Sequence, residues 1–301
     1  MLDRRQFLTG LAGGLLGGAM LPRPARAQQS GVVQLTPTLS LVTAGRTNVL
    51  ALAGGDGLVL VDSGVPEAAV SLMGVLMPMG RLSTAFNTHF HLENTGGNDA
   101  LRQYGATIVA HENTRLWMAT PTWLPAEDRY RPPRSKSAQP TKTFYTEGSM
   151  QASGERIDYG YLIEAHTSGD IYVFFRDSNV LAVGDVASPT RDPELDYLTG
   201  AWIGGRADAL SRLVDLANAD TKIVPGFGPV MTRAQLQAER DLMKTIYDRT
   251  VDRVREGDSA DDMIQGGVLK GLRTFADPHK FMYALQKGLW AHHNKLSPNV
   301  V

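Results

Sequence analysis

The sequence predicts an α/β fold in which two layers of strands are covered by helices, an αββα sandwich with a helical extension at its C-terminus. Two observations lead to this expectation. Short runs of apolar and β-branched residues recur in both halves of the chain, and segments with helical spacing lie between them. After the last strand-like run, from residue 233 onward, only helical patterns follow. Strands that dominate each half and helices that flank them favour a layered sandwich.

In the first half, five strands are expected, and the fourth ends just before His89. They span residues 39–42, 48–53, 58–61, 84–88 and 107–110. Gly-Gly-Asp-Gly at 54–57 predicts a hairpin turn between the second strand and the third. Helical spacing predicts one helix over 67–77 and another over 96–104. The buried side of the first helix should be formed by Val70, Met73, Leu76 and Met77.

The second half begins with an irregular segment, residues 120–143, that is rich in Pro, Arg, Ser and Lys. A segment of this length inside a compact domain is usually functional or mobile. A helix is then expected over 207–217, and strands over 161–164, 171–175, 180–183 and 222–224. Thr232 and Gln235 form a capping box, which predicts a helix from 233 to 256 that Gly257 ends. Its buried face should comprise Leu236, Met243, Ile246 and Val254.

Composition restricts the classes of function. The 301 residues carry 30 Lys and Arg against 31 Asp and Glu, a net charge of −1, so there is no excess of positive charge to bind nucleic acid. The chain has no cysteine, which excludes disulfides, thiolate metal sites, iron–sulfur clusters and a cysteine nucleophile. A bound metal ion would therefore need imidazole and carboxylate ligands.

Residues 1–27 have the pattern of an export signal. A basic start is followed by a glycine-rich apolar stretch and then by Pro-Ala-Arg-Ala, which has the small residues of a cleavage site. Arg4 and Arg5 followed by Phe7 and Leu8 are similar to a twin-arginine signal, which exports proteins that are already folded. An uncleaved membrane anchor is the alternative.

We therefore expect the twin-arginine export machinery as a partner and a periplasmic location. After cleavage the protein should have no stable membrane insertion, because no later segment is apolar enough to span a bilayer. The chain then divides into the signal, a core domain over 28–232 and a helical extension over 233–301.

Three segments carry residues suited to metal chemistry. The first contains His89 and His91, two positions apart and directly after a strand. The second has His166 where a strand meets a turn, and the third has Asp185 at the end of an apolar strand. Histidine is the commonest metal ligand in proteins. Each segment by itself is equally consistent with a structural role.

Together these segments resemble the metallo-β-lactamase-fold hydrolases. The resemblance covers about residues 39–231. It rests on five motifs: Asp62-Ser63-Gly64, His89-Phe90-His91-Leu92-Glu93-Asn94, His166-Thr167-Ser168-Gly169-Asp170, Gly184-Asp185 and Pro225-Gly226-Phe227-Gly228-Pro229. It implies an αββα sandwich that binds two metal ions in a cleft along one edge.

The resemblance also assigns roles to individual residues. It implies that His89, His91 and His166 hold a first metal ion and that Asp185 lies between the first ion and a second. It further implies that Asp62 is a buried acid bracing the loop beneath these ligands.

The sequence departs from the family pattern at three positions, all on the side of the second metal. Family members have Asp where this chain has Glu93, and His where it has Asn94 and Phe227. Phenylalanine offers no lone pair, asparagine is a weak neutral ligand, and glutamate carries its carboxylate one methylene further out. We therefore expect one metal ion per chain, Zn²⁺ or alternatively Fe²⁺, held by three imidazoles with Asp185 or water.

A three-histidine zinc site with an open fourth position lowers the pKa of its bound water to ~7, which makes hydroxide available near neutral pH. Glu93, which such a site does not need as a ligand, is a candidate general base. Asn94 is a candidate hydrogen-bond donor to a developing oxyanion. For both residues the alternative is a supporting role that fixes the imidazole tautomers.

The leading hypothesis is an exported hydrolase that uses metal-bound hydroxide on a small ester, lactone, amide or thioester. The second hypothesis is a non-haem iron oxygenase. Its 2-His-1-carboxylate set would be formed by His89, His166 and Asp185 alone. The sulfur dioxygenases of the superfamily use one iron. The third is a metal- or ligand-binding protein without catalysis. Trp117, Trp123 and Trp202 are candidates for a substrate pocket, with packing as the alternative role.

Overall fold

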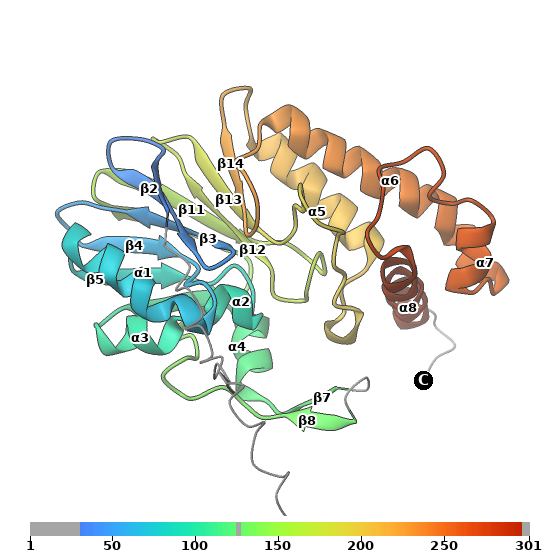
Figure 1. The fold of residues 1–301 in the computed structure, drawn as a ribbon, viewed down its shortest axis with the longest axis horizontal. Coiled ribbons are helices and arrows are strands. Elements are labelled where there is room, and N and C mark those ends of the chain that lie inside the picture. The colour runs from blue at the N-terminus through green and yellow to red at the C-terminus, as the bar shows by residue number, and fades with distance from the viewer. Residues whose placement is uncertain (1–30, 125–127, 297–301) are drawn as a thin grey trace, which may run out of the picture.

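Two β-sheets pack face to face, and helices cover their outer faces (Figure 1). The computed structural model describes residues 31–124 and 128–296. The predicted export signal, residues 1–27, lies outside the described residues. The expected αββα sandwich with C-terminal helices is confirmed.

The first sheet has seven strands in the order β1-β2-β3-β4-β5-β6-β9. Neighbouring strands are antiparallel from β1 to β4 and parallel from β4 to β9. The strands are β1 (Val32–Gln34), β2 (Leu39–Ala44), β3 (Thr47–Leu52), β4 (Leu58–Val61), β5 (Leu82–Phe86), β6 (Thr107–His111) and β9 (Lys142–Phe144). The hairpin expected at 54–57 joins β3 to β4.

The second sheet has the order β10-β11-β12-β13-β14, antiparallel except for the pair β13 and β14. Its strands are β10 (Glu147–Ala152), β11 (Glu155–Tyr161), β12 (Ile171–Phe175), β13 (Val180–Gly184) and β14 (Lys222–Pro225). The strand expected over 161–164 is wrong, because β11 ends at Tyr161, and β10 was not expected at all. Glycines at 148 and 160 weaken the strand pattern, yet a Cβ there would collide with the rings of Tyr159 and Tyr172.

The expectation that residues 120–143 are irregular is wrong in part. This segment contains a short antiparallel hairpin, β7 (Thr122–Leu124) and β8 (Arg129–Arg131), before β9 begins. Trp123 on β7 contacts Tyr130 on β8, with ring centroids 5.0 Å apart. This cross-strand aromatic pair stabilises a hairpin whose polar composition does not suggest strands.

Apolar layers between the sheets and on their outer faces hold the sandwich together. The central layer lies between the sheets and includes Leu50, Leu52, Val59, Val61, Phe86, Ile157, Val173 and Phe175. The alternate residues of β3 and β4 face the helices on the outside of the first sheet: Val49, Ala51, Leu58 and Leu60. Because both faces of these strands are covered, they are apolar at nearly every position.

The helices of the sandwich are α1 (Ala69–Leu76), α2 (Leu92–Thr95), α3 (Asn98–Gln103), α4 (Glu112–Ala119) and α5 (Ile203–Leu216). The buried side expected for the first of these is wrong in part. Val70 and Met77 are exposed, whereas Leu72, Met73 and Leu76 are buried. The buried arc of α1 is thus centred near Leu72 and Leu76, and Val70 and Met77, seven residues apart, lie together on the solvent side.

The C-terminal extension comprises α6 (Arg233–Glu256), α7 (Ala260–Gln265) and α8 (Pro278–Leu296) (Figure 1). Helix α6 packs along α5 on the outside of the second sheet, α8 packs against α5 and α6, and α7 packs against α8. The predicted capping box of α6 is confirmed, with Thr232 accepting from the Gln235 backbone, and Gly257 ends the helix in the left-handed conformation. All four residues expected on its buried face are buried.

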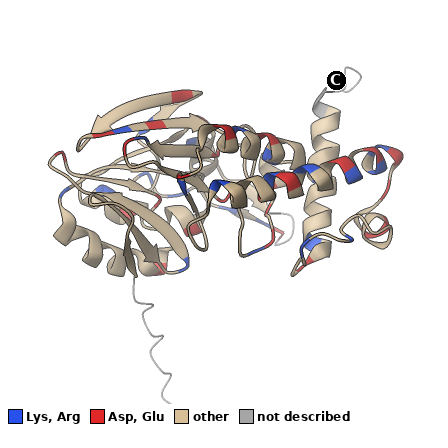
Figure 2. Cartoon of the chain, turned by 90° about the horizontal axis from the view of Figure 1, so that it is seen from above, with Lys and Arg blue, Asp and Glu red and all other residues tan. Residues whose placement is uncertain are grey.

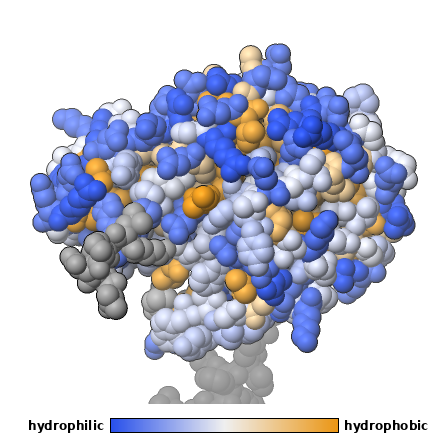
Figure 3. Space-filling view, turned by 180° about the vertical axis from the view of Figure 1, so that it is seen from behind, coloured by the Kyte–Doolittle hydropathy of each residue, from blue (hydrophilic) through white to orange (hydrophobic). Residues whose placement is uncertain are grey.

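The surface is mainly polar and of mixed charge. Figure 2 shows acidic and basic residues interspersed along α6 and over the rest of the molecule. On the face seen in Figure 3, hydrophobic residues form small separate spots among hydrophilic ones. Within the described part of the chain, no helix has the length and apolar character needed to cross a bilayer.

Candidate metal centre

The predicted metal ligands come together at one edge of the sandwich. His89 follows the end of β5, and Asp185 directly follows β13. His166 precedes β12, which runs antiparallel to β13, so the start of β12 lies at the same edge as the end of β13. The topology thus gathers three separate segments of sequence into one place.

Three imidazoles form the centre of the site. One ring nitrogen from each of His89, His91 and His166 lies within 4.8 Å of the others, an arrangement that could hold a metal ion. The Nδ1 of His91 and the Nε2 of His166 are 3.0 Å apart. His89 and His166 are fully buried, and His91 is partly exposed. His91 thus marks the side from which the cluster is accessible.

Hydrogen bonds orient two of the rings. The Nε2 of His91 lies 3.0 Å from a carboxylate oxygen of Asp196, and the Nδ1 of His166 lies 2.9 Å from the backbone oxygen of Glu194. Because these oxygens can only accept, each nitrogen next to them carries a proton. The other nitrogen of each ring, the one facing the cluster, is left as the candidate ligand atom.

His89 is oriented through a longer chain of hydrogen bonds. The Thr88 hydroxyl donates to Asp62 at 2.8 Å, so it can accept from the Nδ1 of His89 at 3.1 Å. The Nε2 of His89 then carries a lone pair, and this buried atom has no hydrogen-bond partner among the described residues. A buried, unpartnered imidazole nitrogen beside two others suits a metal ion.

Asp185 lies on the deep side of the three imidazoles. Its Oδ2 is 4.0 Å from the Nε2 of His89 and 3.9 Å from the Nε2 of His166. Its Oδ1 is buried and has no hydrogen-bond partner among the described residues. The carboxylate therefore adds negative charge and a free oxygen next to the cluster. The residues fit a metal ion by their donor set of three imidazoles and one carboxylate.

The electrostatics of the three rings differ. Burial, together with neighbouring positive charge, lowers the pKa of His89 and of His166 well below the ordinary value of 6.5. Burial also disfavours charge on His91, but the hydrogen bond and charge of Asp196 outweigh it and raise the pKa of His91 to about 9. In the metal-free protein, each ring carries the proton on its outer nitrogen, and His91 alone carries a second one at neutral pH.

Asp62 braces the loop beneath the ligands, as the family resemblance implies. Its carboxylate accepts from the Thr88 backbone at 2.8 Å, from the Thr88 hydroxyl and from the Asn94 amide at 3.0 Å. Burial raises the pKa of Asp62 to about 7 in spite of these hydrogen bonds. Asp62 also has a positive φ of 65°, a strained conformation for a residue with a side chain.

Glu93 and Asn94, the predicted catalytic residues, both belong to α2 and differ in their surroundings. The Asn94 amide nitrogen donates to Asp62, which favours the supporting role over donation to an oxyanion. Glu93 is partly exposed, and its charge raises the pKa of both His91 and Asp185, so its carboxylate lies near both. Glu93 is thus partly accessible beside the three-histidine cluster.

Sequence analysis did not identify two arginines of the site. Arg191 forms a salt bridge with Asp185, and its guanidinium carbon lies 3.7 Å from the ring centroid of Phe227. Arg206 of α5 is fully buried and donates to the backbone oxygens of Asp185 and Glu194, at 2.9 and 2.8 Å. The sequence could have pointed to Arg191, because it lies six residues after the predicted ligand Asp185. Nothing in the local sequence marks Arg206.

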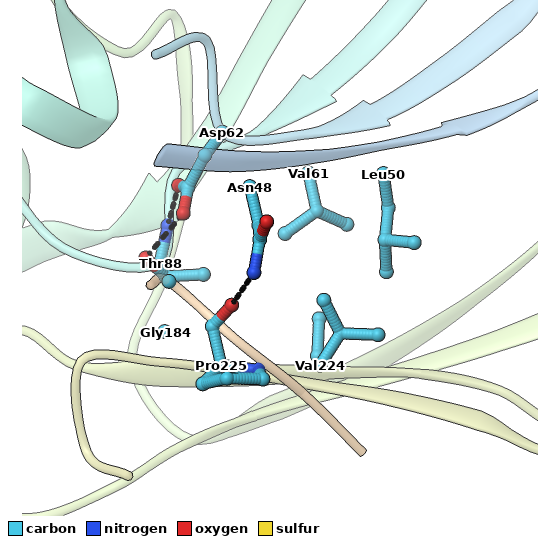
Figure 4. A pocket seen from close by; sticks show the side chains of 10 residues that line it. Asn48, Leu50, Val61, Asp62, Thr88, Gly184, Val224 and Pro225 are labelled. Carbon is cyan, nitrogen blue, oxygen red and sulfur yellow. Dashed lines mark hydrogen bonds between the residues drawn. The ribbon is translucent and has the colours of Figure 1, made fainter. Parts of the chain in front are cut away.

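The floor of the site joins the two halves of the sandwich. Asn48 of β3 donates to the backbone oxygens of Pro225 and Gly228, at 2.9 and 2.8 Å. Figure 4 shows the first of these hydrogen bonds beside the contact between Asp62 and Thr88. The cavity between them measures only about 10 Å³. Below the ligands, the structure is therefore tightly packed. This packing fixes the loop after β5 and the loop after β14 relative to each other.

A larger cavity of about 390 Å³ lies beside the centre. Phe90, which lies between two of the candidate ligands and contacts His91 at 4.6 Å between ring centroids, forms part of its wall. The other lining residues come mainly from α4 and the segment after β8: Leu92, Asp99, Trp117, Met118, Arg131, Pro132, Pro133, Arg134 and Ser135. Trp117 thus lines a pocket, whereas Trp202 stacks on His292 of α8.

The fold and the site define a family. Residues 42–228 match the model of the metallo-β-lactamase superfamily, and the chain belongs to this superfamily. The match ends before α6, so the whole C-terminal extension lies beyond it. The predicted division into residues 28–232 and 233–301 stays a prediction.

Solved structures of the same fold resemble this chain over most of its length. A metallo-β-lactamase from Pontibacter korlensis is 18% identical with a TM-score of 0.59, and the match covers 72% of this chain and 99% of that one. The DIM-1 metallo-β-lactamase exposed to ceftazidime is 17% identical with a TM-score of 0.59, covering 73% and 98%. TMB-1 is 17% identical with a TM-score of 0.57, covering 72% and 98%. At this identity, the likeness shows the fold alone.

Proposed function

We propose that this protein is a metal-dependent hydrolase that cleaves an ester, lactone, amide or thioester bond in a small molecule. The observation that carries the proposal is the convergence of three imidazole nitrogens, each oriented toward the cluster by the hydrogen-bond partner of the other nitrogen of its ring. We further propose that His89, His91 and His166 hold one metal ion, with Asp185 beside it.

A zinc ion held in this way would supply Lewis acidity and a water of lowered pKa. The protein residues around it would orient the reaction. Glu93, partly exposed and near both His91 and Asp185, would accept a proton from the attacking water. Asp62, Asp196 and the Glu194 carbonyl would keep the three imidazoles in the ligating tautomer.

The position of His91 favours a hydrolase over an iron oxygenase. A 2-His-1-carboxylate site would be formed by His89, His166 and Asp185 and would leave the third imidazole outside. Here the candidate ligand atom of His91 lies within 4.8 Å of the other two, and its Nδ1 is 3.0 Å from the Nε2 of His166. A set of three imidazoles matches the donor set of hydrolytic zinc.

The cavity beside Phe90 is the proposed substrate pocket. Its volume of about 390 Å³ suits a small molecule, and it is walled by Trp117 and Met118 with Arg131 above the Phe90 ring at 5.2 Å. Much of this wall comes from the segment after β8, within residues 120–143, a segment whose length is typical of functional or mobile regions.

A direct test is hydrolysis of a p-nitrophenyl ester, a homoserine lactone and a thioester by the zinc-loaded protein. The proposal predicts metal-dependent cleavage of at least one of them, lost in His166→Ala and retained in His279→Ala, an exposed histidine paired with Asp261 on the surface. Iron in place of zinc, with oxygen uptake and no hydrolysis, would instead support the oxygenase.

We also propose that residues 1–27 export the folded protein to the periplasm through the twin-arginine machinery. Arg4 and Arg5 carry this proposal. Fusing residues 1–27 to a reporter that fluoresces only if folded before export should give periplasmic fluorescence, and replacing both arginines with lysine should keep the reporter in the cytoplasm. Periplasmic fluorescence with both lysines would contradict the assignment.

A further inference from the structure

Arg191 places a fixed positive charge against Asp185. The two side chains form a salt bridge in which the carboxylate side chain is 1% exposed and the guanidinium side chain 32% exposed. The same carboxylate oxygen faces the imidazoles of His89 and His166 at 4.0 and 3.9 Å. Asp185 thus lies between the three-histidine centre on one side and a permanent cation on the other.

Phe227 holds the guanidinium in this place. The guanidinium carbon lies 3.7 Å from the Phe227 ring centroid, a close cation–π contact. A histidine at this position could ligate a metal ion, whereas phenylalanine offers only the face of its ring. The Phe227 ring therefore suits the Arg191 guanidinium and does not suit a metal ion.

The C-terminal extension fixes the segment that carries Arg191. Arg273, between α7 and α8, donates to the backbone oxygens of Arg191 at 2.7 Å and Ser188 at 3.0 Å. It is itself held by Glu239 of α6 at 2.8 Å. Because Arg273 and Glu239 lie outside the matched residues 42–228, a part of the chain beyond the family match positions this charge.

A free oxygen atom that would suit a second cation lies next to the salt bridge. The Oδ1 of Asp185 is buried and has no hydrogen-bond partner among the described residues. It faces Gly226, where a Cβ would lie 1.9 Å from it and 3.0 Å from the Nδ2 of Asn94, which donates to Asp62. Without Arg191, this free carboxylate oxygen would attract a hard divalent cation such as Mn²⁺.

We propose that Arg191 acts as a built-in cation in place of a second metal ion, and that the C-terminal extension holds it there. This inference rests on the proposed metal centre and adds the residue that limits it to one ion. A second ion would have to displace the guanidinium from Asp185 and Phe227 and would be repelled by it at close range. The three positions that depart from the family pattern, Glu93, Asn94 and Phe227, are then only part of the reason why the site holds a single metal ion.

The test is the metal content of the full chain after saturation with Zn²⁺ or Mn²⁺ and removal of excess ion, measured by plasma mass spectrometry. Wild type should keep about one metal ion per chain. Arg191→Met saturated with Mn²⁺ should keep about two ions per chain. Arg191→Lys, which keeps the charge, should stay near one. Phe227→His should also stay near one, because Arg191 still pairs with Asp185.

Two further variants separate positioning from general damage. Arg273→Met removes the contacts that fix the Arg191 segment and should raise Mn²⁺ content partway, whereas Arg255→Met, an exposed arginine of α6 paired with Asp252, should not. A folded Arg191→Met protein that keeps one ion, or Phe227→His that gains a second by itself, would overturn the inference. Wild type without any metal would instead contradict the proposed function itself.

Discussion

The Nδ1 of His91 and the Nε2 of His166 lie 3.0 Å apart, a hydrogen-bond distance between two ring nitrogens. A hydrogen bond between two ring nitrogens needs a proton on one of them. The pKa shifts of the two rings show which nitrogen carries it. Asp196 raises the pKa of His91 to about 9, whereas burial lowers that of His166 well below 6.5. At neutral pH the metal-free cluster therefore carries one extra proton, on the Nδ1 of His91, at the place where a metal would bind.

Metal binding should therefore be coupled to release of this proton. Between pH 7 and pH 9 the metal-free His91 is protonated because its pKa is about 9, so the apparent affinity should rise about tenfold per pH unit. Above pH 9 the rise should level off. Titration calorimetry in buffers of different ionisation enthalpy measures the protons released at each pH. An affinity that is constant from pH 7 to pH 9 would show that His91 has an ordinary pKa or is no ligand.

Arg206 should be required to position two of the ligands. Its guanidinium donates to the backbone oxygens of Asp185 and of Glu194, and the second of these accepts from His166. Arg206→Met should lower zinc affinity by about 10- to 100-fold, as loss of such a supporting contact typically does. Competition with a chelator of known affinity measures this change.

Arg212 provides the matched control for Arg206, because it lies on the same helix α5 with an exposed side chain. Arg212→Met should leave zinc affinity unchanged, and Arg206→Lys should restore part of the loss. If a folded Arg206→Met protein binds zinc as tightly as wild type, Arg206 does not position the ligands.

Glu93→Gln tests the proposed proton acceptor. The substitution removes the charge and keeps the shape, so zinc content should be unchanged while turnover of the best substrate falls by about 10²- to 10⁴-fold. Metal analysis and steady-state kinetics on one sample separate the two effects. Wild-type turnover with zinc retained would remove Glu93 as the base and leave it a structural role in α2.

The cap of α6 offers a prediction about stability. Thr232→Ala removes the hydroxyl that accepts from the Gln235 backbone, which should lower the free energy of unfolding by about 1 kcal/mol. Thr245→Ala, a partly exposed threonine in the middle of the same helix, is the control and should change it much less. Urea unfolding measures both. Equal effects would mean that the capping box does not stabilise the helix.

The sequence predicts elements best where a local signal agrees with tertiary packing. The capping box and the buried face of α6 are both confirmed, because the cap and the apolar spacing favour the same helix. The prediction fails where tertiary contacts decide. The glycines of β10 and β11 accommodate tyrosine rings from neighbouring strands, and the buried arc of α1 is set by the sheet it covers.

The same distinction applies to the site. The three histidines follow from spacing and family resemblance, and the structure brings them together. Arg206 and Asp196 act through contacts that join separate segments of sequence, so no local pattern could identify them. Arg191 lies near Asp185 in the sequence, but its role depends on Phe227 and Arg273, which lie far along the chain.

The metal content of the purified full chain bears most directly on the proposed centre. We expect about one zinc per chain, lost in His166→Ala and retained in His279→Ala. Two equivalents in the wild-type protein, or a full equivalent retained by His166→Ala, would contradict it.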